Sequence, residues 1–144
     1  MSPSEFPIKL NSANYSRSGN KFVASNRTGG TYLWCTDFAF SRALEKGLLQ
    51  NYGGLGGKIS GNPGAWDEQA GVWRRQPKAN SFVVSDPNQG GAGSVGHVGF
   101  VERVNANGSL VISEANFGSA RMSFNSRTIN PGTSAFNSAK FVYL

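Results

Sequence analysis

One cysteine and one histidine give this 144-residue chain its clearest capacity for covalent chemistry. Cys35 stands in the run Thr31-Tyr-Leu-Trp-Cys-Thr-Asp37, and His97 opens the run His-Val-Gly-Phe-Val. A cysteine attacks a carbonyl as a thiolate, and a neighbouring imidazole acts as the base that generates and orients it. The pair therefore predicts hydrolysis of an amide, with Cys35 as nucleophile and His97 as general base.

A β-hairpin is the strongest structural signal in the sequence. Two β-rich runs, His97–Val104 and Ser109–Glu114, flank Asn107-Gly108. Asn-Gly is the preferred pair for a two-residue type I′ turn between antiparallel strands. The sequence predicts a tight hairpin with His97 at the start of its first strand and Glu114 at the end of its second.

The hairpin brings polar candidates to His97. With a two-residue turn, Val101 faces Glu114 and Gly99 faces Asn116, whereas a four-residue loop places Asn116 directly opposite His97. Both registers keep His97, Glu114 and Asn116 on one face. An imidazole needs a carboxylate or an amide to hold its ring and fix its tautomer. Glu114 and Asn116 are both candidates for that role.

The element that carries the cysteine is predicted to be a helix. Apolar residues recur at three- and four-residue steps from Cys35 until Gly47, which fits about three helical turns. Cys35 then lies at the helix N-terminus, where the helix dipole favours a thiolate. The glycines at 91, 93, 96 and 99 are expected to leave the surroundings of His97 open to a bound chain.

The remaining elements complete an α+β order. Asn62-Pro63 begins a second helix that runs to about Trp73, with Trp66 and Trp73 in the core. Ser81–Ser85 is a short strand. Runs at 122–124 and 140–144 add further strands, so two helices precede an antiparallel sheet. Residues 1–30 form an extended lead-in, and 31–144 form one catalytic domain.

Composition narrows the function classes. A net charge of +6 implies an anionic partner, but the basic residues are scattered and only Arg74-Arg75 are adjacent. No nucleic-acid-binding motif accompanies that pair, which we interpret as a solvated helix end, so no nucleic-acid partner is expected. No run reaches the length of a membrane span, and Met1–Leu10 lacks the apolar core of a secretory signal.

Metal and disulfide chemistry are not expected. A single cysteine excludes an intramolecular disulfide, and a single histidine would need carboxylates to complete a zinc site. We predict that the protein needs no cofactor.

Four motifs together resemble one family. In order and spacing they are similar to the CHAP family of cysteine- and histidine-dependent amidohydrolases and peptidases: Thr31–Asp37, Gly61-Asn-Pro-Gly-Ala-Trp66, Gly96–Glu102 and Gly108–Asn116. The resemblance implies a papain-like fold and peptidoglycan hydrolysis, by an amidase at the sugar–peptide junction or by an endopeptidase in the stem or cross-bridge. It implies that Cys35 is the nucleophile, His97 the base, Glu114 its orienting partner and Asn116 a fourth polar member.

The sequence also departs from the family pattern. Trp34 stands where many members carry Gln, which leaves the backbone N–H of Cys35 as a candidate oxyanion donor. Asn80 replaces a glycine in Pro77-Lys-Ala-Asn80, a change expected to alter only a turn. Some relatives hold calcium on acids near the cysteine, but Asp37 stands alone here, so no calcium is predicted.

Two other functions fit the same residues. One is an antibacterial effector of the same fold that acts on another amide and has a cognate immunity protein. The other is a non-catalytic module that binds wall polymers. Each residue also has a plainer interpretation: a buried small Cys35, a structural His97, a surface Glu114 and a turn-forming Asn116. The resemblance places the protein's action in the cell wall, periplasm or extracellular space.

Overall fold

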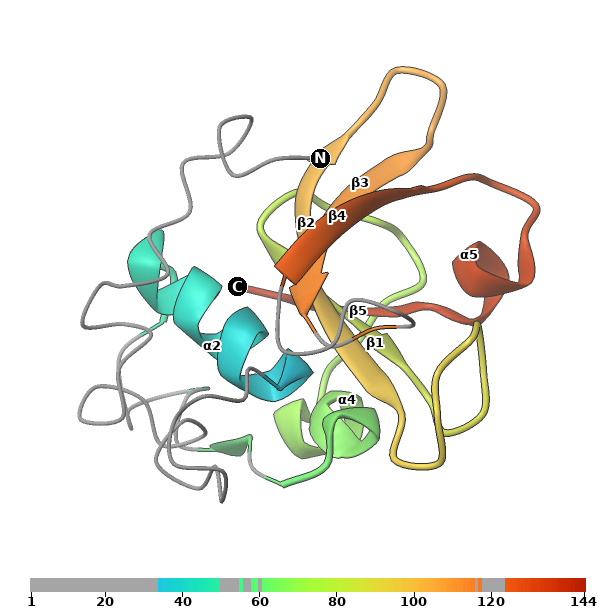
Figure 1. Cartoon of the computed structure of the whole chain (residues 1–144). Helices are drawn as coiled ribbons and strands as arrows, with labels where there is room; N and C mark the ends of the chain where they lie inside the picture. The colour runs from blue at the N-terminus through green and yellow to red at the C-terminus, as the bar shows by residue number, and fades with distance from the viewer. Residues whose placement is uncertain (1–33, 50–54, 56–57, 60, 116, 118–123) are drawn as a thin grey trace.

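The computed structural model describes residues 34–49, 55, 58–59, 61–115, 117 and 124–144. The predicted lead-in and Asn116 lie outside these residues. A five-stranded antiparallel sheet with strand order β4-β3-β2-β1-β5 forms the centre of the molecule (Figure 1). The predicted α+β class is confirmed.

The helices flank this sheet. The longest is α2, followed by a 3-10 turn η2 and two short helices; their bounds are α2 Cys35–Glu45, η2 Pro63–Ala65, α4 Trp66–Ala70 and α5 Ser134–Ser138. The helix predicted from Cys35 to Gly47 is confirmed, and Gly47 has the left-handed φ of 72° that ends helices. No helix in the described ranges combines the length and apolar character that crossing a membrane requires.

The strands agree closely with the sequence pattern. Their bounds are β1 Ser81–Ser85, β2 His97–Val104, β3 Leu110–Ala115, β4 Phe124–Ile129 and β5 Lys140–Tyr143. The predicted strand at 122–124 overlaps β4 only at its first residue, because the later residues of β4 are mostly polar and gave no apolar signal. Residues 122 and 123 lie outside the described residues. The short helix α5 was not predicted.

The second predicted helix ends earlier than expected. Pro63 lies in its first turn as predicted, but the Asn62 side chain makes no capping bond within the described part of the chain. Gly71 adopts φ 80° at the C-cap and stops the helix there. Trp66 is fully buried, whereas Trp73 lies beyond the helix and is 39% exposed, so the core assignment of Trp73 was wrong.

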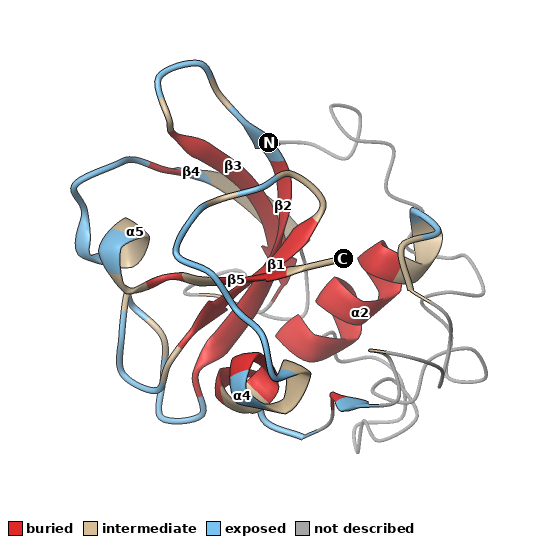
Figure 2. Ribbon diagram, turned by 180° about the vertical axis from the view of Figure 1, so that it is seen from behind, coloured by how far each residue is buried: buried red, intermediate tan, exposed pale blue. Residues whose placement is uncertain are grey.

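Each face of the sheet carries its own apolar cluster. On the α2 side, Ala39 and Phe40 of the helix pack with Trp66 and with Phe82 and Phe100 of the sheet. The other cluster joins Ala135 and Phe136 of α5 to sheet residues such as Val83, Val101, Ile112 and Phe141. Figure 2 shows the inner strands and most of α2 buried.

The hairpin between β2 and β3 forms as predicted, but its turn differs. Asn105 N–H donates to Ser109 O, Gly108 N–H donates to Asn105 O, and Gly108 has φ 86°. This is a three-residue loop closed by a left-handed glycine, not a type I′ turn at Asn107-Gly108. The predicted pairing of Val101 with Glu114 was therefore wrong.

A β-bulge at Glu102 then changes the register. Val104 pairs with Leu110 and Arg103 with Val111, but Val101 pairs with Ile112. Without the bulge, Val101 would face Ser113, and Glu114 would project from the opposite face of the sheet. Side chains alternate along a strand, so His97 projects from the same face as Val101. The bulge places Glu114 on that face as well.

The bulged residue also fastens the helix to the sheet. Arg42 of α2 donates from Nε to Glu102 Oε1 at 2.7 Å and from its terminal nitrogen to Oε2 at 3.2 Å. Both side chains are buried, and Arg42 also bridges to Glu45 at 3.2 Å. This two-point contact fixes the helix that begins at Cys35 against the strand that begins at His97.

Candidate active site

Cys35 is the first residue of α2 and lies at its predicted position. Its side chain is 9% exposed and forms no disulfide. Asp37, also buried, accepts the Trp34 N–H through Oδ2 at 3.0 Å and so caps the helix. The amide groups of a first helical turn lack partners within the helix, so the Cys35 N–H remains available to an oxygen anion near its own sulfur.

His97 lies between the cysteine and the glutamate. Its Nε2 atom is 2.8 Å from Glu114 Oε1, and the Cys35 side chain is near enough to raise the pKa of the ring through hydrogen bonding and charge. Because Nε2 faces the carboxylate, Nδ1 is the nitrogen left for the sulfur. His97 is 5% exposed and Glu114 is fully buried. The fold thus joins three of the four predicted site residues in one chain of contacts.

This environment favours the protonated imidazole. Burial by itself lowers the pKa of His97, but hydrogen bonds to Cys35 and Glu114, together with the negative charges of both groups, outweigh burial. The pKa of His97 is raised to about 9. At neutral pH the ring therefore carries the positive charge that an adjacent thiolate requires.

Arg127 of β4 is a site residue that the sequence analysis missed. Its Nε atom lies 2.6 Å from Glu114 Oε2, so the buried carboxylate is held between two cations. Its guanidinium also lies 4.1 Å from the centre of the Phe117 ring, and that ring lies 4.6 Å from the imidazole of His97. The sequence offered one signal for it, an arginine in a strand that pairs with β3. The sequence analysis placed that strand at 122–124 and so did not include Arg127.

The glycines near His97 do not open the site as expected. Gly96 has φ 79°, and a Cβ on it would lie 2.5 Å from the Cα of Gly64. A Cβ on Gly91 would approach Phe117 to 3.2 Å, and one on Gly99 would approach the Ser113 carbonyl to 3.1 Å. Of these four glycines only Gly93 meets no described atom within 4 Å. Three of them serve close packing around the histidine.

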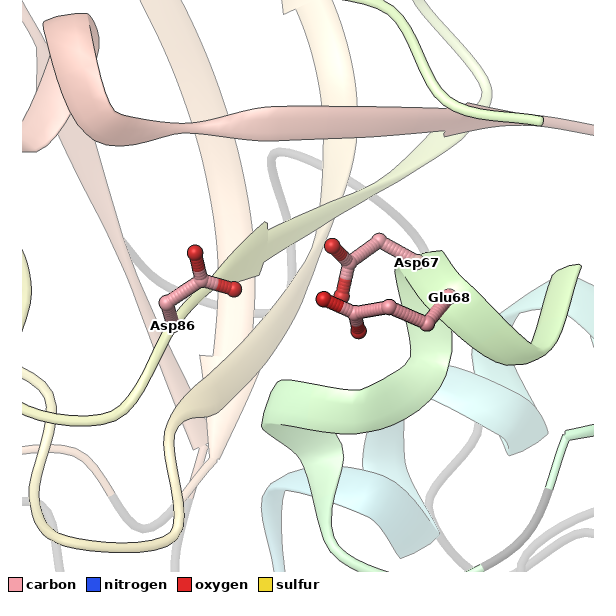
Figure 3. A group of neighbouring side chains, drawn as sticks. All are labelled: Asp67, Glu68 and Asp86. Carbon is pink, nitrogen blue, oxygen red and sulfur yellow. The ribbon is translucent and has the colours of Figure 1, made fainter. Parts of the chain in front are cut away.

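Three carboxylates meet at a second location. Asp67 and Glu68 of α4 and Asp86 after β1 turn their oxygens toward one another, each within 4.8 Å of the others (Figure 3). Lys140 of β5 lies among them, with Nζ 3.0 Å from Asp67 Oδ2 and 2.9 Å from Asp86 Oδ2. One ammonium therefore offsets part of this charge, and the group ties α4 to the sheet.

Comparison with known proteins identifies the family. The family model of the CHAP domain matches residues 27–116, a range that includes Cys35, His97 and Glu114. The chain belongs to the CHAP domain family. A crystal structure of an N-acetylmuramoyl-L-alanine amidase from Staphylococcus aureus has the same fold, with a TM-score of 0.64 and 30% identity over 76% of this chain and 30% of that chain.

Curated relatives have names that refer to autolysis and secretion. Probable autolysin LDP of Staphylococcus aureus is 33% identical over 118 residues, which cover 78% of this chain and 38% of the relative. Staphylococcal secretory antigen SsaA of Staphylococcus epidermidis is 30% identical over 139 residues, covering 92% of this chain and 44% of the relative. The chain thus spans less than half the length of the curated relatives it matches.

Proposed function

We propose that this chain is a peptidoglycan hydrolase that cuts amide bonds with Cys35 as nucleophile and His97 as acid and base. The observation that carries the proposal is the contact series from Cys35 through His97 to Glu114 on a CHAP fold. A thiol, an imidazole and an orienting carboxylate are the three parts that thiol acyl transfer requires. The substrate assignment draws on the amidase and autolysin relatives.

The reaction follows from these positions. The Cys35 thiolate attacks the amide carbonyl and forms a tetrahedral oxyanion, toward which the Cys35 backbone N–H can donate. Protonated His97 gives its proton to the leaving amine as the C–N bond breaks, which leaves a thioester on Cys35. His97 then takes a proton from water, the hydroxide attacks the thioester, and a carboxylic acid and the regenerated thiolate–imidazolium pair result.

Glu114 and Arg127 act as positioning residues in this scheme. Glu114 holds the imidazole through Nε2 and stabilises its positive charge. A buried carboxylate charge needs a compensating cation, and Arg127 supplies one at 2.6 Å. Phe117 packs between the guanidinium and the imidazole and limits rotation of the ring. Asn116 remains the fourth proposed member, next in sequence to Ala115 at the end of β3.

The bond class also follows from the carboxylate inventory. Glycoside cleavage uses two carboxyl groups that flank the sugar, one of them a proton donor. Among the described residues, Glu114 is paired with Arg127 and His97, Glu45 and Glu102 share Arg42, and Asp67, Glu68 and Asp86 surround Lys140. The chemistry favours an amide bond, at the sugar–peptide junction or within the stem or cross-bridge. The protein would act in the cell wall, periplasm or extracellular space.

Digestion of purified sacculi tests the proposal. Mass spectrometry of the released fragments should find new free amines, or intact glycan strands separated from peptides, without new reducing sugar ends. Cys35→Ala should abolish release while sedimentation with sacculi persists. New reducing ends without new amines would exclude an amidohydrolase. Equal release by wild type and Cys35→Ala would exclude the thiol mechanism, and binding without any release would leave a wall-binding module.

A further inference from the structure

A polar depression of about 490 Å³, open to solvent and here called the cavity, lies apart from the cysteine. It is formed by α5, by the segment after β1 and by one arginine that precedes the sheet: Ser134, Asn137 and Ser138, Asp86 and Gln89, and Arg75. Every lining residue carries a hydrogen-bonding or charged group. Such a surface suits a polar ligand better than an apolar one.

One loop connects the cavity wall to the strand that begins at His97. Ser85, the last residue of β1, pairs with His97, and the loop that leads from Ser85 to His97 contributes to the cavity wall. Gly90 of this loop packs against α5, where a Cβ would lie 3.2 Å from the helix backbone. Gly91 packs in the same way against Phe117, whose ring contacts His97. The loop therefore contacts α5, which lines the cavity, at Gly90. It contacts Phe117, the aromatic neighbour of His97, at Gly91.

Several polar groups of the cavity have unused bonding capacity. The side-chain amides of Gln89 and Asn137 have no hydrogen-bond partner among the described residues. The guanidinium of Arg75 is fixed by bonds from one terminal nitrogen to the carbonyls of Asn137 and Ala139, each 3.2 Å, which leaves its other N–H groups for a ligand. Asp86 is one-third exposed and uses Oδ2 for Lys140.

The pattern of charges distinguishes among polar ligands. Two side-chain amides can pair with the N–H and C=O groups of a peptide, a guanidinium with a carboxylate, and Asp86 with an ammonium. A neutral sugar would leave both charged groups unused. Sugars also favour a free aromatic face, but Trp73 beside Arg75 already holds two cations against its ring, at 5.2 Å and 4.6 Å. The cavity suits a zwitterionic peptide better than a glycan.

We propose that this cavity binds the part of a peptidoglycan stem peptide that carries a free amine and a free carboxylate, beside the bond that Cys35 cuts. The ligand class rests on the proposed function, because the stem is the zwitterionic part of that substrate. Arg75 receives the carboxylate, Asp86 receives the amine, and Gln89 with Asn137 bind the backbone between them.

Binding can be tested without turnover. The full chain with Cys35→Ala, labelled with ¹⁵N, is titrated with a synthetic tetrapeptide of the stem that has a free side-chain amine and a free carboxylate. The side-chain NH₂ signals of Gln89 and Asn137 should shift saturably. A chitin oligosaccharide of similar size, without either charge, should leave both signals in place. Saturable shifts with the oligosaccharide alone would overturn the peptide assignment.

Matched variants separate the cavity from general surface effects. Gln89→Ala/Asn137→Ala should weaken tetrapeptide binding about tenfold, since two hydrogen bonds are lost. The control Gln76→Ala/Asn130→Ala changes an exposed glutamine and an exposed asparagine outside the cavity and should bind as before. Equal binding by both double variants would overturn the proposal. If wild type hydrolyses sacculi but the tetrapeptide does not shift the Gln89 and Asn137 signals, the peptide site in the cavity is refuted and the proposed function is not. If the signals shift but wild type does not hydrolyse sacculi, only the proposed function is refuted.

Discussion

Arg42 on α2 and Glu102 on β2 form a buried two-point ion pair between the helix that begins at Cys35 and the strand that begins at His97. Alternation along β2 places Glu102 on the same face as Phe100, which packs against α2, and Glu102 is the extra residue of the bulge between Val101 and Arg103. The distance between the proposed nucleophile and base therefore depends on a contact several residues from either of them.

Removing one member of this pair should be costly. Arg42→Met leaves Glu102 buried without its cation and should lower the free energy of unfolding by about 3–5 kcal/mol in urea titration. Arg42→Met/Glu102→Met should recover much of that loss because no unpaired charge remains. Arg103→Met, at an exposed arginine next to the bulge, should change stability by less than about 0.5 kcal/mol. A single variant as stable as the wild type would show that the pair contributes little.

The pH profile should reflect the raised pKa of His97. Because the proposed mechanism uses the imidazolium as proton donor and as partner of the thiolate, kcat/KM on a short soluble peptide should fall as pH rises through about 9. Glu114→Gln should move this alkaline limb down toward the ordinary histidine value and lower kcat. An alkaline limb that stays at the same pH in Glu114→Gln would show that the carboxylate does not hold the charged ring.

The same pKa predicts how stability depends on pH. Folding raises the pKa of His97 from 6.5 to about 9, so its stabilising contribution is fully present below pH 6.5 and is lost as pH rises through 9. At 1.36 kcal/mol per pKa unit the contribution is on the order of 3 kcal/mol. Urea titrations between pH 6 and 10 should show this loss in wild type and a smaller one in Glu114→Gln.

Arg127 offers a separate test of positioning. Arg127→Met should lower kcat/KM about tenfold and shift the alkaline limb toward lower pH, since Glu114 is no longer held against the imidazole. Arg127→Lys keeps the positive charge but lacks the planar guanidinium, so its kcat/KM should lie between those of wild type and Arg127→Met. Loss of stability with an unshifted pH profile and unchanged kcat would mean that Arg127 is a structural residue only.

Catalysis is predicted to be independent of metal. The thiol mechanism needs no ion, and within the described part of the chain the carboxylate group of Asp67, Glu68 and Asp86 surrounds Lys140. Release of fragments from sacculi should survive exhaustive dialysis against EDTA. Activity that disappears on dialysis and returns only with added calcium or zinc would contradict this prediction.

Local patterns determined much of this protein in advance. The spacing of apolar residues after Cys35 predicted a helix that begins there, and the β-rich runs around Asn107-Gly108 predicted the hairpin that begins at His97. These signals are readable because helix periodicity, strand propensity and turn preference act over a few neighbouring residues. The candidate nucleophile and base followed from them together with the family resemblance.

Tertiary structure decided which side chains meet. The turn has three loop residues instead of two, and only the bulge at Glu102 returns Glu114 to the face of His97. A one-residue change in register turns every side chain over, and the turn preference of Asn107-Gly108 alone does not fix the register. Arg127 could not be assigned to the site from the sequence, because its strand pairs with β3 only in the folded sheet. The sequence was enough to propose Cys35 and His97 as nucleophile and base. The register and the charges around these two residues depend on contacts between segments distant along the chain.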